Sequence, residues 1–144
     1  TLSRHFPDER SLFAACSAHW AEENPPPDIR HWAKIADPAE RLDAALSDLY
    51  AYYRQVEGMM DKLLRDEATV EVVNELMGAY RAMLDQATEI LMKGRGLRGN
   101  AAKRTRAAIG HALTRRPGEA LPRGQRLAVG EADATMSRLV AVVA

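Results

Sequence analysis

The sequence predicts an all-α fold of six helices without a β-strand. Ala, Leu, Arg, Glu and Met, which favour helices, are abundant, whereas aromatic residues make up only 6% of the chain. Apolar residues recur at spacings of three and four over long stretches, and this spacing places them along one face of a helix. Proline and glycine gather in short segments between those stretches. With 144 residues, 47% of them hydrophobic and 28% charged, the chain can bury one ordinary core.

A first helix is predicted over residues 8–23. Asp8 follows Pro7 and can cap the helix start by accepting a hydrogen bond from a backbone N–H. The residues at helical spacing are Leu12, Phe13, Cys16, His19 and Trp20. The Pro-Pro-Pro run at residues 25–27 ends the helix, because proline cannot continue its hydrogen-bond ladder.

The clearest helix start is the segment Asp37-Pro38-Ala39-Glu40, which combines a capping Asp, Pro in the first turn and Glu at the third helical position. A single apolar stripe follows it, at Leu42, Ala45, Leu46, Leu49, Tyr50, Tyr53 and Val56. We expect this helix to end near Gly58 and a short separate helix to cover residues 59–64.

Three more helices complete the prediction. A long one covers residues 72–91 and stops before Gly94, and a connector with Gly94, Gly96 and Gly99 follows it. Asn100 is expected to cap the next helix, over residues 100–114, and a Pro- and Gly-containing loop leads to the last helix, over residues 131–143. We see no internal repeat.

The single cysteine, Cys16, has no partner within the chain for a disulfide, and no signal segment opens the sequence, so we expect a cytoplasmic protein. The longest apolar run covers residues 139–144, far short of the roughly 20 residues that span a bilayer. No contact with a membrane is therefore expected.

The charges are unevenly distributed although they sum to zero. Residues 93–126 contain ten Lys or Arg and one acid, Glu119. Such a segment fits nucleic-acid binding, but a solvated helix face followed by a loop is the more common explanation of a charge run.

Catalysis and metal binding have little support in the sequence. Cys16 and His19 are the only pair at helical distance that resembles a nucleophile with its base, and Cys16 is better interpreted as small core filler. His31 and His111 fit no metal-ligand spacing, and the glycines at 94, 96 and 99 follow no strand, as a nucleotide-binding loop would require. We expect no enzyme, no metal and no cofactor.

Residues 1–13, TLSRHFPDERSLF, resemble the segment of TetR-family repressors that joins the DNA-recognition helix to the helix after it. The family pattern is close to T-x-Y-x-H-F followed by a capped turn, and Ser3 stands where the family has an aromatic residue. The resemblance implies that residues 1–7 are the end of the DNA-recognition helix, with the rest of the head absent, and that residues 8–144 are the ligand-binding and dimerisation domain. By the same resemblance Thr1, Ser3 and His5 occupy DNA-contacting positions, whereas Phe6 more simply packs the head on the next helix.

The resemblance also places an inducer cavity among the helices that begin near residues 8, 38, 59 and 69. We expect a small effector, apolar and aromatic or cationic, because flexible Met and flat aromatic side chains on the inner faces suit such a ligand. Plain core packing is the alternative interpretation of each of these residues. The candidate ligand-binding residues are Trp20, Tyr50, Tyr53, Met59, Met60, Met77 and Tyr80.

In the family the last two helices pair with those of a twin subunit, so the chain is expected to form a homodimer through a four-helix bundle. Each helix carries an apolar stripe with small residues that permit close approach. The candidate interface residues are Ala108, Ile109, Ala112, Leu113, Met136, Leu139, Val140 and Val143.

Two classes of function therefore remain. The first is a small-molecule-responsive repressor that meets operator DNA only through the missing head. The second is a helical dimerisation or interaction module without small-molecule sensing. The sequence does not identify the effector or the operator.

Overall fold

The computed structural model describes residues 8–114 and 129–144, without the side chains of residues 129, 130 and 132, and this part of the chain contains helices and no strand. The helices are α1 (Glu9–Glu23), α2 (Ile29–Ala33), α3 (Pro38–Asp66), α4 (Glu71–Met92), α5 (Gly99–Thr114) and α6 (Val129–Val143). The predicted all-α class is confirmed for these residues. The number of six helices also agrees, but only because one short helix was missed and two predicted helices form a single one.

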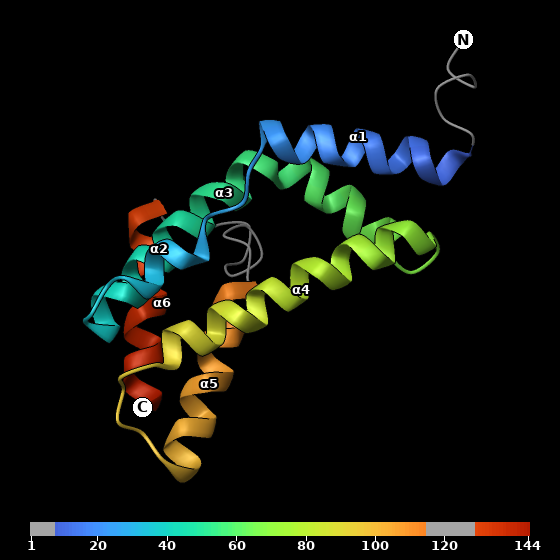
Figure 1. The fold of residues 1–144 in the computed structure, drawn as a ribbon. Helices are drawn as coiled ribbons and strands as arrows, with labels where there is room; N and C mark the ends of the chain where they lie inside the picture. Colours follow the sequence, from blue (N-terminus) through green and yellow to red (C-terminus); the bar gives the residue numbers. More distant parts are fainter. Residues whose placement is uncertain (1–7, 115–128) are drawn as a thin grey trace, which may run out of the picture.

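The long helix α3 lies at the centre of the arrangement (Figure 1). It packs against α2, α4, α5 and α6, while α5 also packs against both α4 and α6. Helix α1 lies across one end of the molecule and makes its helix contacts with α4 (Figure 1). The core is therefore formed by α2 to α6, and α1 is an addition to its edge.

Two of the predicted helix starts have the expected hydrogen bonds. Asp8 Oδ1 accepts from the Ser11 N–H at 2.6 Å, and Asp37 Oδ2 accepts from the Glu40 N–H at 2.9 Å. Helix α5 begins one residue before the predicted cap, so Asn100 lies inside the helix. The glycine connector before it is confirmed, since Gly94, Gly96 and Gly99 all have positive φ, which residues with a Cβ adopt only with strain.

The predicted helix end at Gly58 is wrong, because α3 continues to Asp66 as one helix of 29 residues. A glycine inside a helix costs only about 1 kcal/mol relative to Ala. Val56 and Met60 are buried on either side of Gly58, so an unbroken helix keeps both side chains in the core. Their burial outweighs the glycine penalty.

The sequence analysis missed α2, which is only five residues long. Asp28 caps it by accepting from the Arg30 N–H at 3.0 Å. Trp32 is 1% exposed and its indole N–H donates to Asp48 Oδ2 of α3 at 2.9 Å. One buried aromatic residue thus docks α2, and a single residue creates no periodic pattern in the sequence.

The core lies where α3, α4, α5 and α6 meet. Its largest fully buried apolar side chains are Trp32, Leu46, Leu49, Tyr50, Leu91, Ile109, Leu113 and Val140. Leu46, Leu49 and Tyr50 belong to the apolar stripe that the sequence predicts after Asp37, and every residue of that stripe is buried, so the predicted inward face of α3 is confirmed.

Arg41 is a buried cation at the junction of α2, α3 and α4, and it is 6% exposed. Its guanidinium donates to four backbone carbonyls at 2.8–3.0 Å, those of Ile35 and Ala36 before α3 and of Ile90 and Lys93 at the end of α4. The C-terminal end of a helix carries partial negative charge and unpaired carbonyls, so it is a suitable partner for a cation. Arg41 therefore fixes where α4 ends relative to α3.

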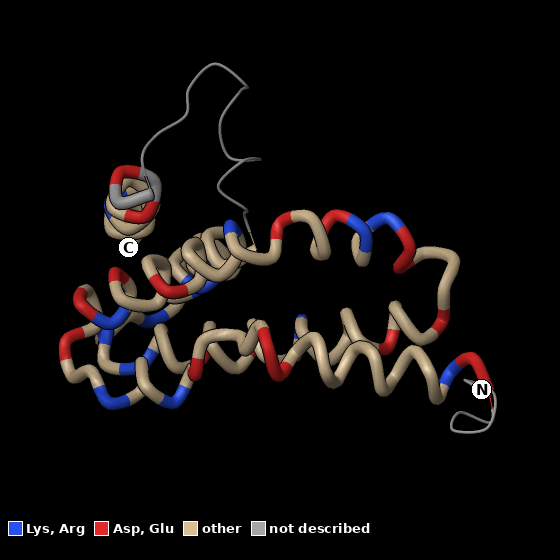
Figure 2. The backbone as a smooth tube through the Cα atoms, turned by 90° about the horizontal axis from the view of Figure 1, so that it is seen from above, with Lys and Arg blue, Asp and Glu red and all other residues tan. Residues whose placement is uncertain are grey.

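Exposed charges of both signs are interspersed along the helices (Figure 2). Arg106 of α5 pairs with Glu89 of α4, and Arg95 turns inward to donate to the carbonyls of Leu91 and Pro38. The described part of the basic segment is thus partly engaged within the chain and forms no uniformly basic face. Among the described helices, none is long and apolar enough to cross a membrane.

We predict that Arg41→Leu lowers the free energy of unfolding by roughly 3 kcal/mol, because it leaves buried carbonyls without donors. Urea unfolding followed by circular dichroism at 222 nm measures the change. Arg30→Leu is the matched control, since Arg30 is exposed and bonds only to Asp28 two residues away. Equal stability of the two variants would contradict the structural role of Arg41.

Candidate functional site

The predicted ligand-binding residues come together in the structure, but mostly inside the core. Tyr50, Tyr53, Met60 and Met77 are buried, whereas Trp20 of α1 and Tyr80 of α4 are half-buried against the same apolar cluster. The seventh residue, Met59, is half-buried on α3 outside that cluster. Three helices, α1, α3 and α4, thus contribute to one aromatic and thioether-rich region.

The tyrosine hydroxyls in this region are hydrogen-bonded to the last turn of α5. Tyr50 donates to the carbonyl of Ala112 at 3.0 Å and Tyr53 donates to that of Leu113 at 2.5 Å. Tyr80 in turn donates to Tyr53 at 2.7 Å. Burial of a phenol is acceptable only when its O–H has a partner, so these bonds explain how three tyrosines fit here.

Burial also controls the ionisation of these phenols. Loss of hydration raises the pKa of Tyr50 to about 12, with a smaller contribution from nearby Tyr53. The same cause raises the pKa of Tyr80 far above its ordinary value of 10.0. Both side chains are therefore neutral phenols at physiological pH.

Helix α1 closes one side of this region and is loosely held. None of its residues is buried, although Phe13 and Trp20 pack partly against the core. Near its start Arg10 forms an exposed ion pair with both carboxylate oxygens of Glu75 on α4, and at its end Asn24 accepts from Gln55 of α3 at 3.1 Å. The apolar side chains of Leu64, Val70 and Leu76 at the α3–α4 end remain 38–43% exposed.

The predicted dimer residues divide into two groups. Ile109, Ala112, Leu113 and Val140 are at most 1% exposed within the single chain, so they offer almost no surface to a partner subunit, although Val140 reaches the lining of the groove described below. Their apolar stripes are satisfied by packing of α5 and α6 on α3 and α4. The surface available to a partner comes from the neighbouring positions on the two helices.

Those neighbouring positions form an apolar groove of about 360 Å³ between α5 and α6. Leu139 is 55% exposed and Val142 83% exposed beside it. The prediction omitted Val142 and His111, although each lies three residues from a predicted interface residue. The groove is lined by Ala108, His111, Met136, Leu139, Val140, Val142 and Val143.

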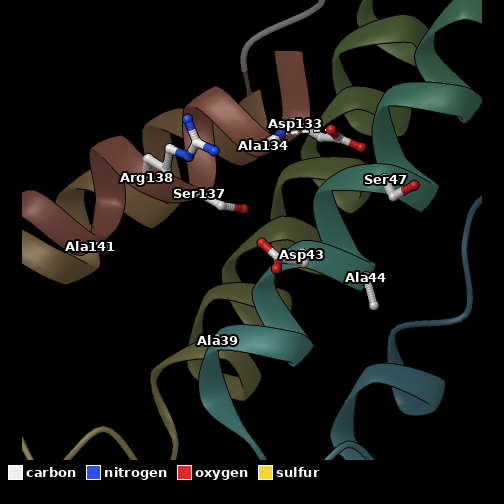
Figure 3. A pocket seen from close by; sticks show the side chains of 9 residues that line it. All are labelled: Ala39, Asp43, Ala44, Ser47, Asp133, Ala134, Ser137, Arg138 and Ala141. Atoms are coloured by element: carbon white, nitrogen blue, oxygen red, sulfur yellow. Dashed lines mark hydrogen bonds between the residues drawn. The ribbon is translucent and has the colours of Figure 1, made fainter. Parts of the chain in front are cut away.

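A second groove, of about 670 Å³, runs between α3 and α6 and was not predicted. The Asp43 carboxylate and the Ser137 hydroxyl point toward each other across it (Figure 3). Polar and small residues four apart on each helix, such as Asp43 and Ser47 or Asp133 and Ser137, are the signal that could have indicated it. Most of the charged groups in this groove are exposed to water, so their interaction with a charged ligand would be weak. We therefore do not take the groove as a candidate binding site.

Three other predictions from the sequence concern Cys16, metal binding and DNA contact. Cys16 is exposed on α1, so its interpretation as core filler is wrong, because it lies on the face of α1 turned to solvent. Within residues 8–114 and 129–144, no three His, Cys, Asp or Glu side chains are grouped to hold a metal ion. The DNA-binding candidates Thr1, Ser3 and His5 lie outside the described residues.

Comparisons with known proteins give no relative for this chain: no protein-family model, no characterised protein and no solved structure matches it significantly.

We predict that Tyr50 makes the unfolding free energy depend on pH in the alkaline range. The unfolded chain releases this phenol's proton near pH 10.0, whereas the folded chain retains it up to about pH 12. The stabilisation is therefore complete below pH 10.0 and is lost as the pH rises through about 12. Urea unfolding at a series of alkaline pH values should show a steeper loss of stability for the wild type than for Tyr50→Phe. Both proteins share every other titrating group, so parallel curves would contradict the role of Tyr50.

Proposed function

We propose that this chain is the regulatory domain of a TetR-like, small-molecule-responsive transcriptional repressor. In this proposal an effector binds among α1, α3 and α4, and α5 and α6 form the dimer interface. The observation that carries it is the attachment of α1: the helix places Phe13 and Trp20 against the aromatic core, yet buries none of its residues. A helix held in this way can change position without disrupting the core.

The residues around α1 suit a flat apolar ligand. Trp20 and Tyr80 are half-buried and offer ring faces, while Met83 packs against the same core and offers a flexible thioether. Ring faces also attract cations, by about 0.5–2 kcal/mol depending on desolvation. An aromatic or cationic effector, bound as α1 shifts, is therefore the chemistry that these side chains support best.

The groove between α5 and α6 supports the dimer. Leu139 and Val142 are large apolar side chains in water, and a two-fold axis through the groove would place one copy's pair against the other's. Four helices, two from each subunit, would then form the bundle. Burial of these side chains supplies the driving force.

DNA binding in this proposal belongs to a helix-turn-helix head at the N-terminal side of α1. Thr1, Ser3 and His5 would stand in its recognition helix, and a recognition helix needs its partner helix for docking in the major groove. Residues 8–144 therefore bind no operator by themselves. Such a repressor acts in the cytoplasm, and the proposal includes no catalytic step and no cofactor.

The second candidate function is a helical dimerisation module that senses no small molecule. The exposed apolar groove of α5 and α6 supports it equally well. The two candidates differ in the role of α1, because only the first requires a ligand beside Trp20.

We predict that small aromatic compounds, neutral or cationic, bind this chain and change the fluorescence of Trp20. Titration of a panel of such compounds should change the emission of the wild type, and of Trp32→Phe, whose remaining tryptophan is Trp20. Trp20→Phe should lose the change, because its remaining tryptophan, Trp32, is buried where α2 docks on α3. A panel that never binds would contradict sensing and favour the dimerisation module.

We predict that Leu139→Glu converts a dimer of this chain to a monomer in sedimentation equilibrium. The substitution places two carboxylates, one from each subunit, in an apolar symmetric interface. Leu64→Glu is the control, because Leu64 is also exposed but lies on α3, away from the groove. Monomer formation by the control, or a Leu139→Glu dimer at concentrations where the wild type is dimeric, would show that the interface lies elsewhere.

A further inference from the structure

The hydroxyls of Tyr80 and Tyr53 form a chain that ends on a backbone carbonyl. Tyr80 on α4 donates to Tyr53 Oη on α3 at 2.7 Å, and Tyr53 donates to the Leu113 carbonyl of α5 at 2.5 Å. Leu113 lies in the last turn of α5, where carbonyls have no partner within the helix. The chain thus links three helices through two hydroxyl protons.

The direction of both protons is determined by the carbonyl. A carbonyl oxygen only accepts hydrogen bonds, so the Tyr53 proton must point to Leu113. Tyr53 Oη must then accept from Tyr80, which points the Tyr80 proton inward as well. If Tyr53 instead donated its proton to Tyr80, the Tyr53 hydroxyl and the Leu113 carbonyl oxygen would lie at hydrogen-bond distance with no proton between them. The carbonyl would then be unpaired.

Tyr80 Oη therefore turns only lone pairs to any further partner. Among the described residues nothing donates a hydrogen bond to it, while its ring is half-buried against the core on α4, the helix on which α1 packs. The phenol also stays protonated at neutral pH, because burial raises its pKa. At Tyr80 the proposed effector site would thus offer a ligand an acceptor of hydrogen bonds and no donor.

Building on the proposed function, we propose that the effector is an apolar amine that binds in its protonated form and donates an N–H hydrogen bond to Tyr80 Oη. A charged donor makes a stronger bond to a neutral acceptor than a neutral donor does. Its positive charge is also attracted by the ring faces of Trp20 and Tyr80. An effector that has only hydrogen-bond acceptors, such as a ketone or a carboxylate, could form no hydrogen bond with Tyr80 Oη, because the Tyr80 proton is already donated to Tyr53.

Two matched probes test this proposal by isothermal titration calorimetry on the intact chain at pH 7.5. Dimethyl(4-phenylbutyl)ammonium has one N–H, and trimethyl(4-phenylbutyl)ammonium has the same charge and the same apolar body without it. We expect the wild type to bind the N–H probe roughly tenfold more tightly, which is the factor that a net hydrogen bond to a charged group gives. Tyr80→Phe keeps the ring and should bind both probes with the affinity that the wild type has for the trimethyl probe.

A second variant tests the direction of the protons. Tyr53→Phe removes the acceptor of the Tyr80 proton, so Tyr80 becomes free to donate outward. The neutral ketone 6-phenylhexan-2-one should then bind several-fold more tightly than it binds the wild type. Circular dichroism checks that both variants are folded.

The outcomes separate this inference from the proposed function. Equal binding of the two cations by the wild type, or a preference that survives in Tyr80→Phe, would overturn the donor requirement and leave sensing intact. No gain for the ketone in Tyr53→Phe would overturn the inward direction of the Tyr80 proton. Failure of both cations to bind the wild type would overturn the amine effector, and failure of the wider aromatic panel would overturn sensing itself.

Discussion

Side chains of α3 supply the hydrogen bonds that the C-terminal ends of α4 and α5 lack. Every helix leaves its last carbonyls without intrahelical partners, and in a buried position they must be paired. Arg41 donates to Ile90 and Lys93 at the end of α4, while Tyr50 and Tyr53 donate to Ala112 and Leu113 at the end of α5. Helix α3 thus determines where both neighbours stop and which faces they present, and the rest of the core follows from that placement.

The same bonds decide the polarity of the region beside α1. A tyrosine that caps α5 has its only proton engaged, so it reaches any ligand as an acceptor. Tyr50 and Tyr53 are buried where they cap α5. The Tyr80 proton points to Tyr53 because Tyr53 donates its own proton to Leu113. In the proposed function, the hydrogen bond that Tyr80 offers to an effector would therefore follow from how α5 ends, and substitution of Tyr53 would change it.

The sequence predicts those parts of the structure that local rules control. Asp8 and Asp37 cap their helices because capping involves only neighbouring residues, and the stripes of α3 and α4 follow from helical spacing. The continuity of α3 at Gly58, the docking of Trp32 and the carbonyl partners of Arg41 depend on contacts across the fold, so local patterns miss them. For the site, six of the seven residues that the sequence groups lie in or against one apolar cluster, whereas Met59 lies outside it. The sequence does not separate Tyr53, which is core, from Tyr80, which is at the edge, because both lie on equally apolar stripes.

The difference in attachment between α1 and the core gives the proposed regulation a physical basis. To move a two-state equilibrium from mostly one form to mostly the other takes about 5.5 kcal/mol of differential ligand affinity. Displacing α3, α4 or α5 would leave the carbonyls bound by Arg41, Tyr50 and Tyr53 unpaired and expose fully buried side chains, which costs more than one small ligand supplies. Displacing α1 breaks one exposed ion pair and the exposed hydrogen bond from Gln55 to Asn24, and it uncovers the partly buried Phe13 and Trp20. Of the described helices, α1 is therefore the element that an effector of the proposed kind would move most readily, and it is also the helix that follows the segment resembling a DNA-recognition helix.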